Sequence, residues 1–153
     1  MEQGLHVSVV IPAYRSATIL PELVQRLEDT FRVEGINYEI IIVNDCSPDD
    51  GATWDCIQRL TTEHTGIVGI DLQKNSGQFN ATMCGMEQAK GDLIITMDDD
   101  LQHAPEAVPL LLDTIQSGNA DCVMASFPSK RHSLVRNLGS LLVRSTYRIF
   151  HYQ

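Results

Sequence analysis

The sequence predicts an α/β fold with a mostly parallel sheet flanked by helices. Short apolar runs alternate along the chain with segments whose apolar residues recur every three or four positions, which are the patterns of buried strands and amphipathic helices. Polar clusters follow the apolar runs. Parallel neighbours in one sheet need a long crossover, usually a helix, so the alternation predicts a parallel sheet with helices on both faces.

The first half of the chain predicts two strands and two helices. Val7–Ile11 is a β-branched run closed by Pro12, and Tyr38–Val43 is a second apolar run, so both are predicted to be strands. The segment between them predicts a helix, because apolar residues have helical spacing at Ile19, Leu20, Leu23, Leu27 and Phe31. After a turn-rich segment, Thr53–Glu63 predicts a second helix with apolar residues at Trp54, Ile57 and Leu60.

The second half predicts three more strands, with a helix between each strand and the next. The strands are the apolar runs Ile67–Leu72, Leu93–Met97 and Cys122–Ala125. Phe79–Ala89 is predicted to be a helix with Phe79, Met83 and Met86 on one face. A further helix is expected over Pro105–Gln116, because proline is favoured in the first turn of a helix.

Composition and motif searches exclude several classes of protein. The chain has 153 residues, a net charge of -9 and four cysteines without C-x-x-C spacing, so we expect reduced thiols, a cytoplasmic location and no zinc site. No apolar run approaches the ~20 residues that span a bilayer. The G-x-G-x-x-G, P-loop and G-x-S-x-G patterns are absent, which argues against dinucleotide-dependent, P-loop and serine-hydrolase enzymes. The acidic composition also argues against nucleic acid as a partner.

Four polar clusters follow the predicted strands, over residues 12–15, 45–50, 74–78 and 98–102. Ligands of parallel sheets bind beyond the carboxyl ends of the strands, so these clusters predict one site. In the last cluster, strand alternation places Asp98 and Asp100 on one side and Asp99 on the other. Two nearby ionised carboxylates need a cation, and oxygen ligands, including Gln102, favour Mg²⁺ or Mn²⁺. The alternative is an acidic cluster that caps a helix or is solvated.

The motifs around these clusters resemble those of family 2 glycosyltransferases, and among them the polyprenyl- and dolichyl-phosphate sugar transferases. Residues 9–14 (VVIPAY), 42–49 (IVNDCSPD), 75–81 (NSGQFNA) and 98–106 (DDDLQHAPE) carry the resemblance, in this order. The resemblance covers about residues 7–126. It implies the A-type glycosyltransferase fold and transfer of a sugar, with inversion, from a nucleotide-diphosphate donor to a polyisoprenyl phosphate.

The resemblance also implies a role for each matching residue. Eight residues are implied to bind the nucleotide-sugar, with Asp45 accepting a hydrogen bond from the base: Pro12, Ala13, Tyr14, Asp45, Asn75, Gly77, Asp98 and Asp99. Asp98, Asp100 and Gln102 are implied to hold the metal. Asp98, Asp100 and Arg136 are implied to be catalytic, with Arg136 directed toward the acceptor phosphate.

Three positions depart from the family pattern. Cys46 stands where glycine is common, Asp99 where alanine is frequent, and Phe127 where an arginine is frequent. Lys130 and Arg131 are candidates to replace that arginine at the acceptor phosphate, beside Arg136.

The charge of the chain divides it into two regions. Residues 1–126 hold all 20 acidic residues, whereas 127–153 hold five basic residues and no acidic one. We therefore predict a nucleotide-sugar-binding domain over 1–126 and a basic amphipathic helical segment over 127–153. Its helix, Leu134–Phe150, is expected either to lie on a membrane surface or to pack on the domain. Relatives continue further, so the chain is expected to be a truncated piece.

Alternative functions remain at this stage. A truncated chain that binds nucleotide-sugar or docks on a membrane without catalysis has the same motifs. A family 2 transferase with a saccharide acceptor shares them too. A sugar nucleotidyltransferase also binds magnesium through carboxylates, but it normally opens with a glycine-rich basic loop, which residues 12–16 do not provide.

Overall fold

The computed structural model describes residues 5–118 and 120–125, and it confirms the predicted α/β fold. Four parallel strands form one sheet in the order β3-β2-β1-β4. They are β1 (His6–Ala13), β2 (Asn37–Asn44), β3 (Ile67–Asp71) and β4 (Leu93–Thr96). All carboxyl ends therefore lie at the same edge of the sheet.

Pro12 lies inside β1, which ends two residues beyond the predicted end of this strand at Ile11. β1 pairs with β2 from His6 to Ala13, but its pairing with β4 ends at Val10. Beyond Val10, β1 has a neighbour on one side only among the described strands. A proline is tolerated there because it has no N–H to donate.

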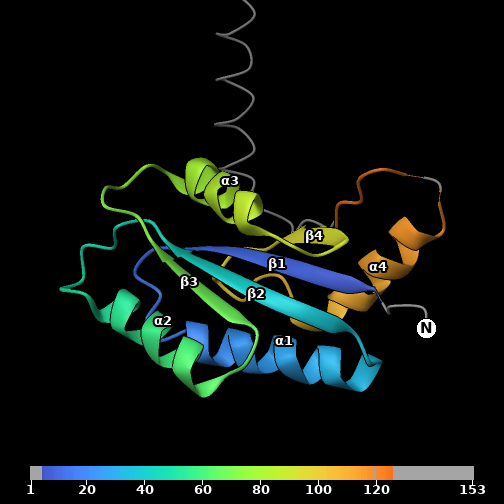
Figure 1. Ribbon diagram of the computed structural model, residues 1–153, viewed down its shortest axis with the longest axis horizontal. Helices are drawn as coiled ribbons and strands as arrows, with labels where there is room; N and C mark the ends of the chain where they lie inside the picture. The colour runs from blue at the N-terminus through green and yellow to red at the C-terminus, as the bar shows by residue number, and fades with distance from the viewer. Residues whose placement is uncertain (1–4, 119, 126–153) are drawn as a thin grey trace, which may run out of the picture. The chain divides into compact units, whose positions relative to one another are not determined.

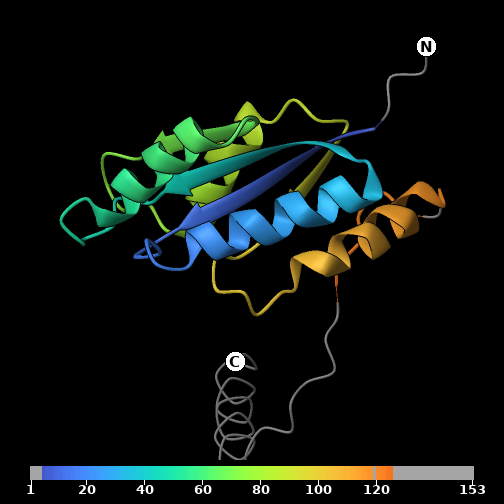
Figure 2. The same ribbon diagram turned by 90° about the horizontal axis from the view of Figure 1, so that it is seen from below.

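Helices cover both faces of the sheet (Figure 1). α1 (Leu20–Glu34) and α2 (Ala52–Glu63) lie on one face, and α3 (Gln78–Gln88) lies on the other. Figure 2 shows α1 beside the last of the described helical segments, which begins as the 3-10 turn η1 (Pro105–Ala107) and continues as α4 (Val108–Gln116). The sequence predicted a single helix over this region. Pro109 explains why the structure divides it, because proline has no N–H to donate the α-helical hydrogen bond to Pro105.

The two faces of the sheet bury two separate apolar clusters. The larger cluster packs under α1 and α2 and includes Leu23, Phe31 and Ile57. The smaller one lies under α3 and contains Val10, Ile41, Val43 and Ala81.

A glycine lets α3 approach the sheet closely. A Cβ placed on Gly85 would lie 3.1 Å from Cγ2 of Val43, which is a tight contact, and 2.5 Å from Cγ1 of Val10, a distance that real Cβ atoms essentially never adopt. The absence of a side chain at this position therefore sets the height of α3 above β1 and β2. The first residue of α3 lines the site described below, so the same contact also positions the site.

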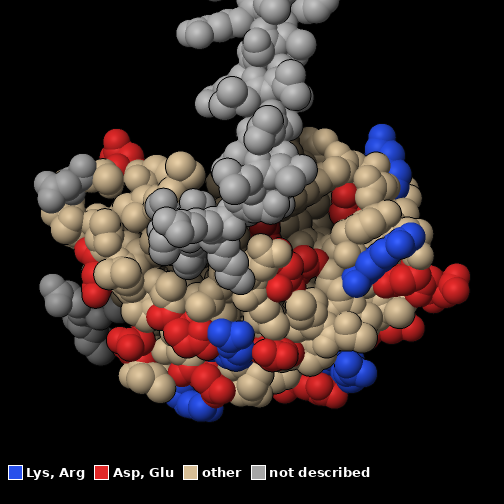
Figure 3. Space-filling view, turned by 180° about the vertical axis from the view of Figure 1, so that it is seen from behind, with Lys and Arg blue, Asp and Glu red and all other residues tan. Residues whose placement is uncertain are grey.

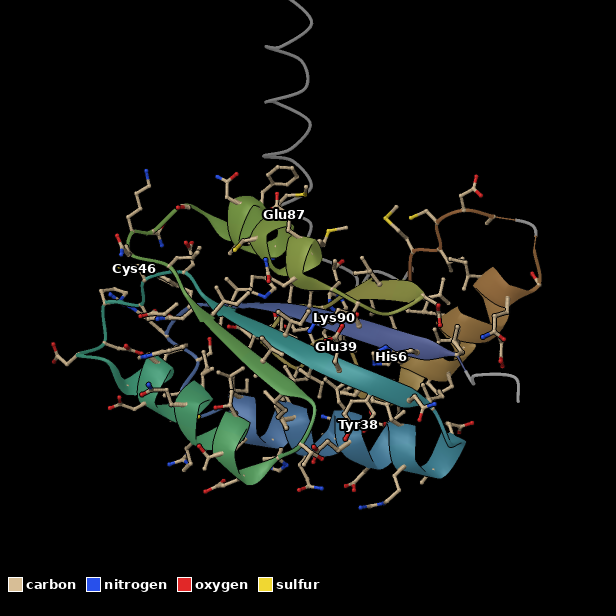
Figure 4. The ribbon with its side chains drawn as sticks, viewed as in Figure 1. His6, Tyr38, Glu39, Cys46, Glu87 and Lys90 are labelled. Atoms are coloured by element: carbon tan, nitrogen blue, oxygen red, sulfur yellow. The ribbon has the colours of Figure 1, made fainter. Side chains whose placement is uncertain are left out.

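A buried carboxylate ties the chain together at the amino edge of the sheet. The Ser8 hydroxyl and the Lys90 backbone N–H each donate to Oε1 of Glu39, at 2.6 Å. Burial opposes ionisation of Glu39, but these hydrogen bonds, together with the electrostatic effect of His6 and Lys90, outweigh it, so the pKa of the carboxyl is lowered. In Figure 4 Glu39 and Lys90 lie together, far along the sheet from Cys46. This cluster fixes the entry into β4 and takes no part in the site at the opposite edge.

The prediction of a fifth strand is wrong. Residues 122–125 have no regular secondary structure, and the first of the two compact units of the chain ends at Asp121. A short apolar run indicates strand propensity, but a strand also needs a neighbour with which to pair. The helix predicted over 134–150, and with it the basic segment 127–153, lies outside the described residues. None of the described helices is long and apolar enough to cross a bilayer.

Candidate active site

The carboxyl edge of the sheet holds a pocket of about 340 Å³. Each of the four strand ends contributes to it, as expected for a parallel sheet. Its lining residues are Pro12, Ala13, Tyr14, Asp45, Asn75, Gly77, Gln78, Asp98, Asp99 and Asp100. The structure thus brings together the eight residues that the resemblance assigned to the nucleotide-sugar. Whether they bind it stays a prediction.

The pocket lining is acidic. Four of its ten residues are aspartates, and none is lysine or arginine. Acidic side chains also outnumber basic ones among the described residues on the face shown in Figure 3. A cation that offsets these carboxylates would favour binding of an anionic ligand.

Asp45 organises the wall formed by the β3–α3 loop. Its buried carboxylate accepts hydrogen bonds from the backbone N–H groups of Ser76, at 2.7 Å, and Gly77, at 2.8 Å. Its carbonyl accepts one from the Asn75 amide, at 3.2 Å. These donors lie at the N-terminus of α3, where the helix dipole favours a negative charge. Asp45 therefore acts as a cap supplied from another strand, in addition to lining the pocket.

Side chains from other elements hold the β1–α1 loop. The backbone N–H of Tyr14 donates to Oδ2 of Asp99, at 3.2 Å. The backbone N–H of Arg15 donates to the Ser47 hydroxyl at 3.0 Å, and the backbone N–H of Ser16 donates to the Thr53 hydroxyl at 2.9 Å. Tyr14 is 47% exposed, and the guanidinium carbon of Arg15 lies 5.8 Å from the centre of its ring. The aromatic ring is therefore presented at the pocket by a fixed loop.

The three aspartates lie beyond the end of the last strand of the sheet. β4 ends at Thr96, two residues before Asp98, so the extended geometry assumed for the cluster does not continue into it. The segment turns instead, and Leu101 has a φ of 57°. As a result Asp98, Asp99 and Asp100 all line the pocket.

Each of these carboxylates has a different partner. Oδ1 of Asp98 accepts from the Gln78 side-chain amide at 2.6 Å, and Oδ1 of Asp100 accepts from the Gln102 backbone N–H at 2.9 Å. Oδ2 of Asp99 accepts from the Ser16 hydroxyl. Asp98 and Asp100 thus remain beside the open pocket, whereas Asp99 is engaged with the β1–α1 loop.

One lining residue was given no role by the sequence, and some predicted site residues are not among the lining residues. Gln78 belongs to the predicted cluster 74–78, but only the structure shows its hydrogen bond to Asp98, twenty positions along the chain. Gln102, a predicted metal ligand, is not among the lining residues. The predicted acceptor-phosphate residues Lys130, Arg131 and Arg136 lie outside the described residues.

The aspartates supply part of a site for a divalent cation. Within residues 5–118 and 120–125, no group of three acidic, histidine or cysteine side chains is arranged to hold a metal ion. Asp98 and Asp100 offer hard carboxylate oxygens at the pocket, the ligand type that Mg²⁺ and Mn²⁺ prefer. Magnesium commonly binds one or two carboxylates together with substrate phosphates and waters. The residues present fit a cation that a diphosphate ligand helps to hold.

The loops at this edge carry strained backbone. Four non-glycine residues have positive φ, and all lie in segments that follow strands: Arg15 (58°), Cys46 (51°), Asp50 (53°) and Leu101 (57°). Positive φ explains why glycine is common at position 46 in the family that the motifs resemble, because only glycine adopts this conformation without a steric penalty.

The family model for "Glycosyl transferase family 2" matches residues 8–151 of the chain. The chain belongs to glycosyltransferase family 2. Among curated family 2 relatives, it is 39% identical over 115 residues to dolichol-phosphate mannosyltransferase of Pyrococcus furiosus, which covers 75% of this chain and 31% of the relative. It is 38% identical over 140 residues to undecaprenyl-phosphate 4-deoxy-4-formamido-L-arabinose transferase of Aeromonas hydrophila, which covers 92% of this chain and 42% of the relative. The chain thus spans less than half the length of these relatives.

Solved structures confirm the A-type glycosyltransferase fold of this family 2 chain. A mannosyltransferase from Pyrobaculum calidifontis, solved in complex with GDP-Man and Mn²⁺, aligns with a TM-score of 0.60 at 20% identity, over 72% of this chain and 32% of that one. S. aureus TarS 1-349 aligns with a TM-score of 0.61 at 20% identity, over 82% and 39%. At this identity the likeness concerns the fold alone.

Proposed function

We propose that this chain is the donor-binding part of an enzyme that transfers a sugar, with inversion, from a nucleotide diphosphate to a polyisoprenyl phosphate. The observation that carries the proposal is the acidic pocket at the carboxyl edge of the sheet, in which all four family motifs meet. The two relatives described above are named for transfer to dolichol phosphate and undecaprenyl phosphate, which supports a lipid phosphate as the acceptor over a saccharide.

Different residues of the pocket are assigned to different parts of the donor. Pro12, Ala13 and Tyr14, which line the pocket, are assigned to the base and ribose. Asp98 and Asp100 hold Mg²⁺ or Mn²⁺ against the diphosphate, and the cation offsets the charge of the departing group when bound. Gln78 fixes the Asp98 carboxylate through its 2.6 Å hydrogen bond.

The proposed acceptor needs little activation by the protein. A phosphate monoester is already ionised at neutral pH, so an acceptor of this kind requires no general base, whereas a saccharide hydroxyl does. Arg136, with Lys130 and Arg131, is proposed to bind the acceptor phosphate. We place the enzyme at the cytoplasmic face of a membrane, with segment 134–150 on the bilayer surface, because such segments rich in basic and apolar residues bind anionic lipid.

Calorimetric titration with UDP and GDP, with and without Mn²⁺, tests donor binding. We expect Mn²⁺ to strengthen nucleotide binding, and Asp100→Asn to remove this gain and leave metal-free binding unchanged. Asp113→Asn, on the exposed surface of α4, is the control for the loss of one carboxylate. Equal enhancement by Mn²⁺ in wild type and Asp100→Asn would rule out the metal assignment.

Transfer of radiolabelled sugar to polyprenyl phosphate tests the reaction. The chain is compared with a longer polypeptide of the same protein, because its relatives extend well beyond the matched region. Transfer by the longer polypeptide supports the proposal. If neither transfers sugar to the lipid while donor binding persists, the chain is a binding module, and transfer to a saccharide instead would reassign the acceptor.

A further inference from the structure

Asp99 differs from its two neighbours in what its carboxylate binds. One oxygen, Oδ2, accepts from both the Tyr14 backbone N–H and the Ser16 hydroxyl. The same hydroxyl also accepts from the Tyr14 N–H at 3.0 Å. The three groups close a small ring of hydrogen bonds between the end of β4 and the β1–α1 loop, which are more than eighty residues apart in sequence.

We propose that Asp99 is a positioning residue that locks the β1–α1 loop and thereby sets the place of Tyr14, and that it is not a ligand of the metal or the donor. The proposal rests on the proposed function for the nature of the ligand, but the lock itself is a property of the free protein. It assigns Asp99 a role different from the donor contact that the motif resemblance implies.

The lock extends beyond Asp99 into the body of the domain. Ser16, 4% exposed, donates through its backbone N–H to the Thr53 hydroxyl at 2.9 Å. That hydroxyl in turn donates to Oδ2 of Asp49, which also accepts from the Thr53 N–H at 3.2 Å. A continuous chain of hydrogen bonds thus connects the β4 end, the β1–α1 loop and the start of α2. Such connected networks rigidify the groups they join.

The lock has a direct consequence for the pocket. Tyr14 lines the pocket and contributes a bond to the ring through its backbone. Without the carboxylate at position 99, the Tyr14 N–H keeps only the Ser16 hydroxyl, and that hydroxyl loses its acceptor. The loop then samples more conformations, and a ligand must order it on binding, which lowers affinity.

Binding of UMP and GMP without metal isolates this effect, because the cation takes no part. We expect Asp99→Ala to weaken binding of the preferred monophosphate on the order of tenfold, equal to about 1.4 kcal/mol. Ser16→Ala is expected to weaken it similarly, and the double variant no more than Asp99→Ala alone, because both remove the same lock. Asp99→Asn keeps a side-chain oxygen as acceptor and should restore most of the affinity. Asp50→Asn, in an exposed loop position, is the control.

The opposite pattern would overturn the proposal. If Asp99 holds the metal or donor through its charge, Ser16→Ala leaves binding unchanged, Asp99→Asn is as weak as Asp99→Ala, and the enhancement of UDP or GDP binding by Mn²⁺ is lost. The lock predicts that this enhancement is retained in all three variants.

Amide hydrogen exchange in the free protein tests the lock without any ligand. The Tyr14 amide should exchange at least tenfold faster in Asp99→Ala than in wild type, and near the wild-type rate in Asp99→Asn. The Leu23 amide within α1 is the internal reference for global stability. Unchanged exchange at Tyr14 refutes the lock, whereas failure of wild type to bind any nucleotide refutes the proposed function and leaves the exchange result to decide the lock.

Discussion

Replacing Asp45 by asparagine tests how the pocket is built. The carboxylate accepts two backbone hydrogen bonds, at 2.7 Å and 2.8 Å, and the side chain is 4% exposed. An amide at this position presents one oxygen and one N–H₂ group, so one of the two backbone donors would face another donor. Hydrogen bonds to charged groups contribute about 1.5–3 kcal/mol each, and a charge at a helix N-terminus about 0.3–1 kcal/mol.

Water reaches part of this loop, because Ser76 and Gly77 are only partly buried, so the lower end of these ranges applies. We expect Asp45→Asn to lower the free energy of unfolding by about 2 kcal/mol, measured by urea denaturation. Nucleotide affinity should fall as well, because the displaced loop forms a pocket wall. Asp50→Asn is the matched control, since Asp50 is exposed in the same loop and asparagine tolerates its positive φ.

The result that refutes this reasoning is a variant with wild-type stability. If Asp45→Asn and Asp50→Asn unfold at the same urea concentration while only the former loses nucleotide binding, the carboxylate serves the ligand alone. The Ser76 and Gly77 hydrogen bonds would then contribute nothing measurable to the fold.

Three further substitutions test the packing of α3, the buried Glu39 carboxylate and the ion pair between Arg26 and Glu106. Gly85→Ala gains about 1 kcal/mol of helix propensity but forces a Cβ to within 2.5 Å of Val10. Overpacking of this kind costs about 1–3 kcal/mol of stability. We therefore expect a net loss of stability in thermal melting, and weaker nucleotide binding. Glu39→Gln should lower the free energy of unfolding by about 1 kcal/mol at pH 7. Because the pKa of Glu39 is lowered on folding, the stabilisation by its carboxylate is present above about pH 4.5. The difference in unfolding free energy from wild type should therefore narrow as the pH falls further. The Arg26 guanidinium holds the pKa of Glu106 at about 2, below its usual value of 4.5, so this pair stabilises fully above about pH 4.5 and its effect is lost as the pH falls through about 2. Glu106→Gln should cost about 0.5 kcal/mol at pH 7, since the pair is exposed. The difference in unfolding free energy should shrink steadily from about pH 4.5 toward pH 2.

The strands and helices could be predicted because their signals are local. Val7–Ile11 and Tyr38–Val43 are apolar enough to be strands buried on both faces, and the structure extends both by one or two residues at each end. The segment 122–125 has a similar apolar signal and forms no strand. The difference is whether a neighbouring strand is available for pairing, and the sequence of four residues carries no information about that.

The sequence could predict which residues line the site, but not which hydrogen bonds they form. Its lining residues follow strand ends, and parallel topology brings strand ends together, so the sequence order was sufficient to group them. The partners of the Asp45 and Asp99 carboxylates come from 31 to 85 positions away. Which hydrogen bonds form there depends on how each loop turns, and the turn after Thr96 already departs from the regular strand geometry on which the prediction relied.

The left-handed residues at the rim have a consequence for engineering this domain. Arg15, Cys46 and Leu101 each adopt a backbone conformation that disfavours their own side chain, at about 1–2 kcal/mol apiece. Exchanging them for glycine relaxes this conformation, yet it also widens the range of shapes open to loops that must present Tyr14 and the aspartates to a ligand. Screens that select variants of this domain only for heat resistance should therefore collect glycines at these positions, and the survivors should bind nucleotide less tightly than the parent.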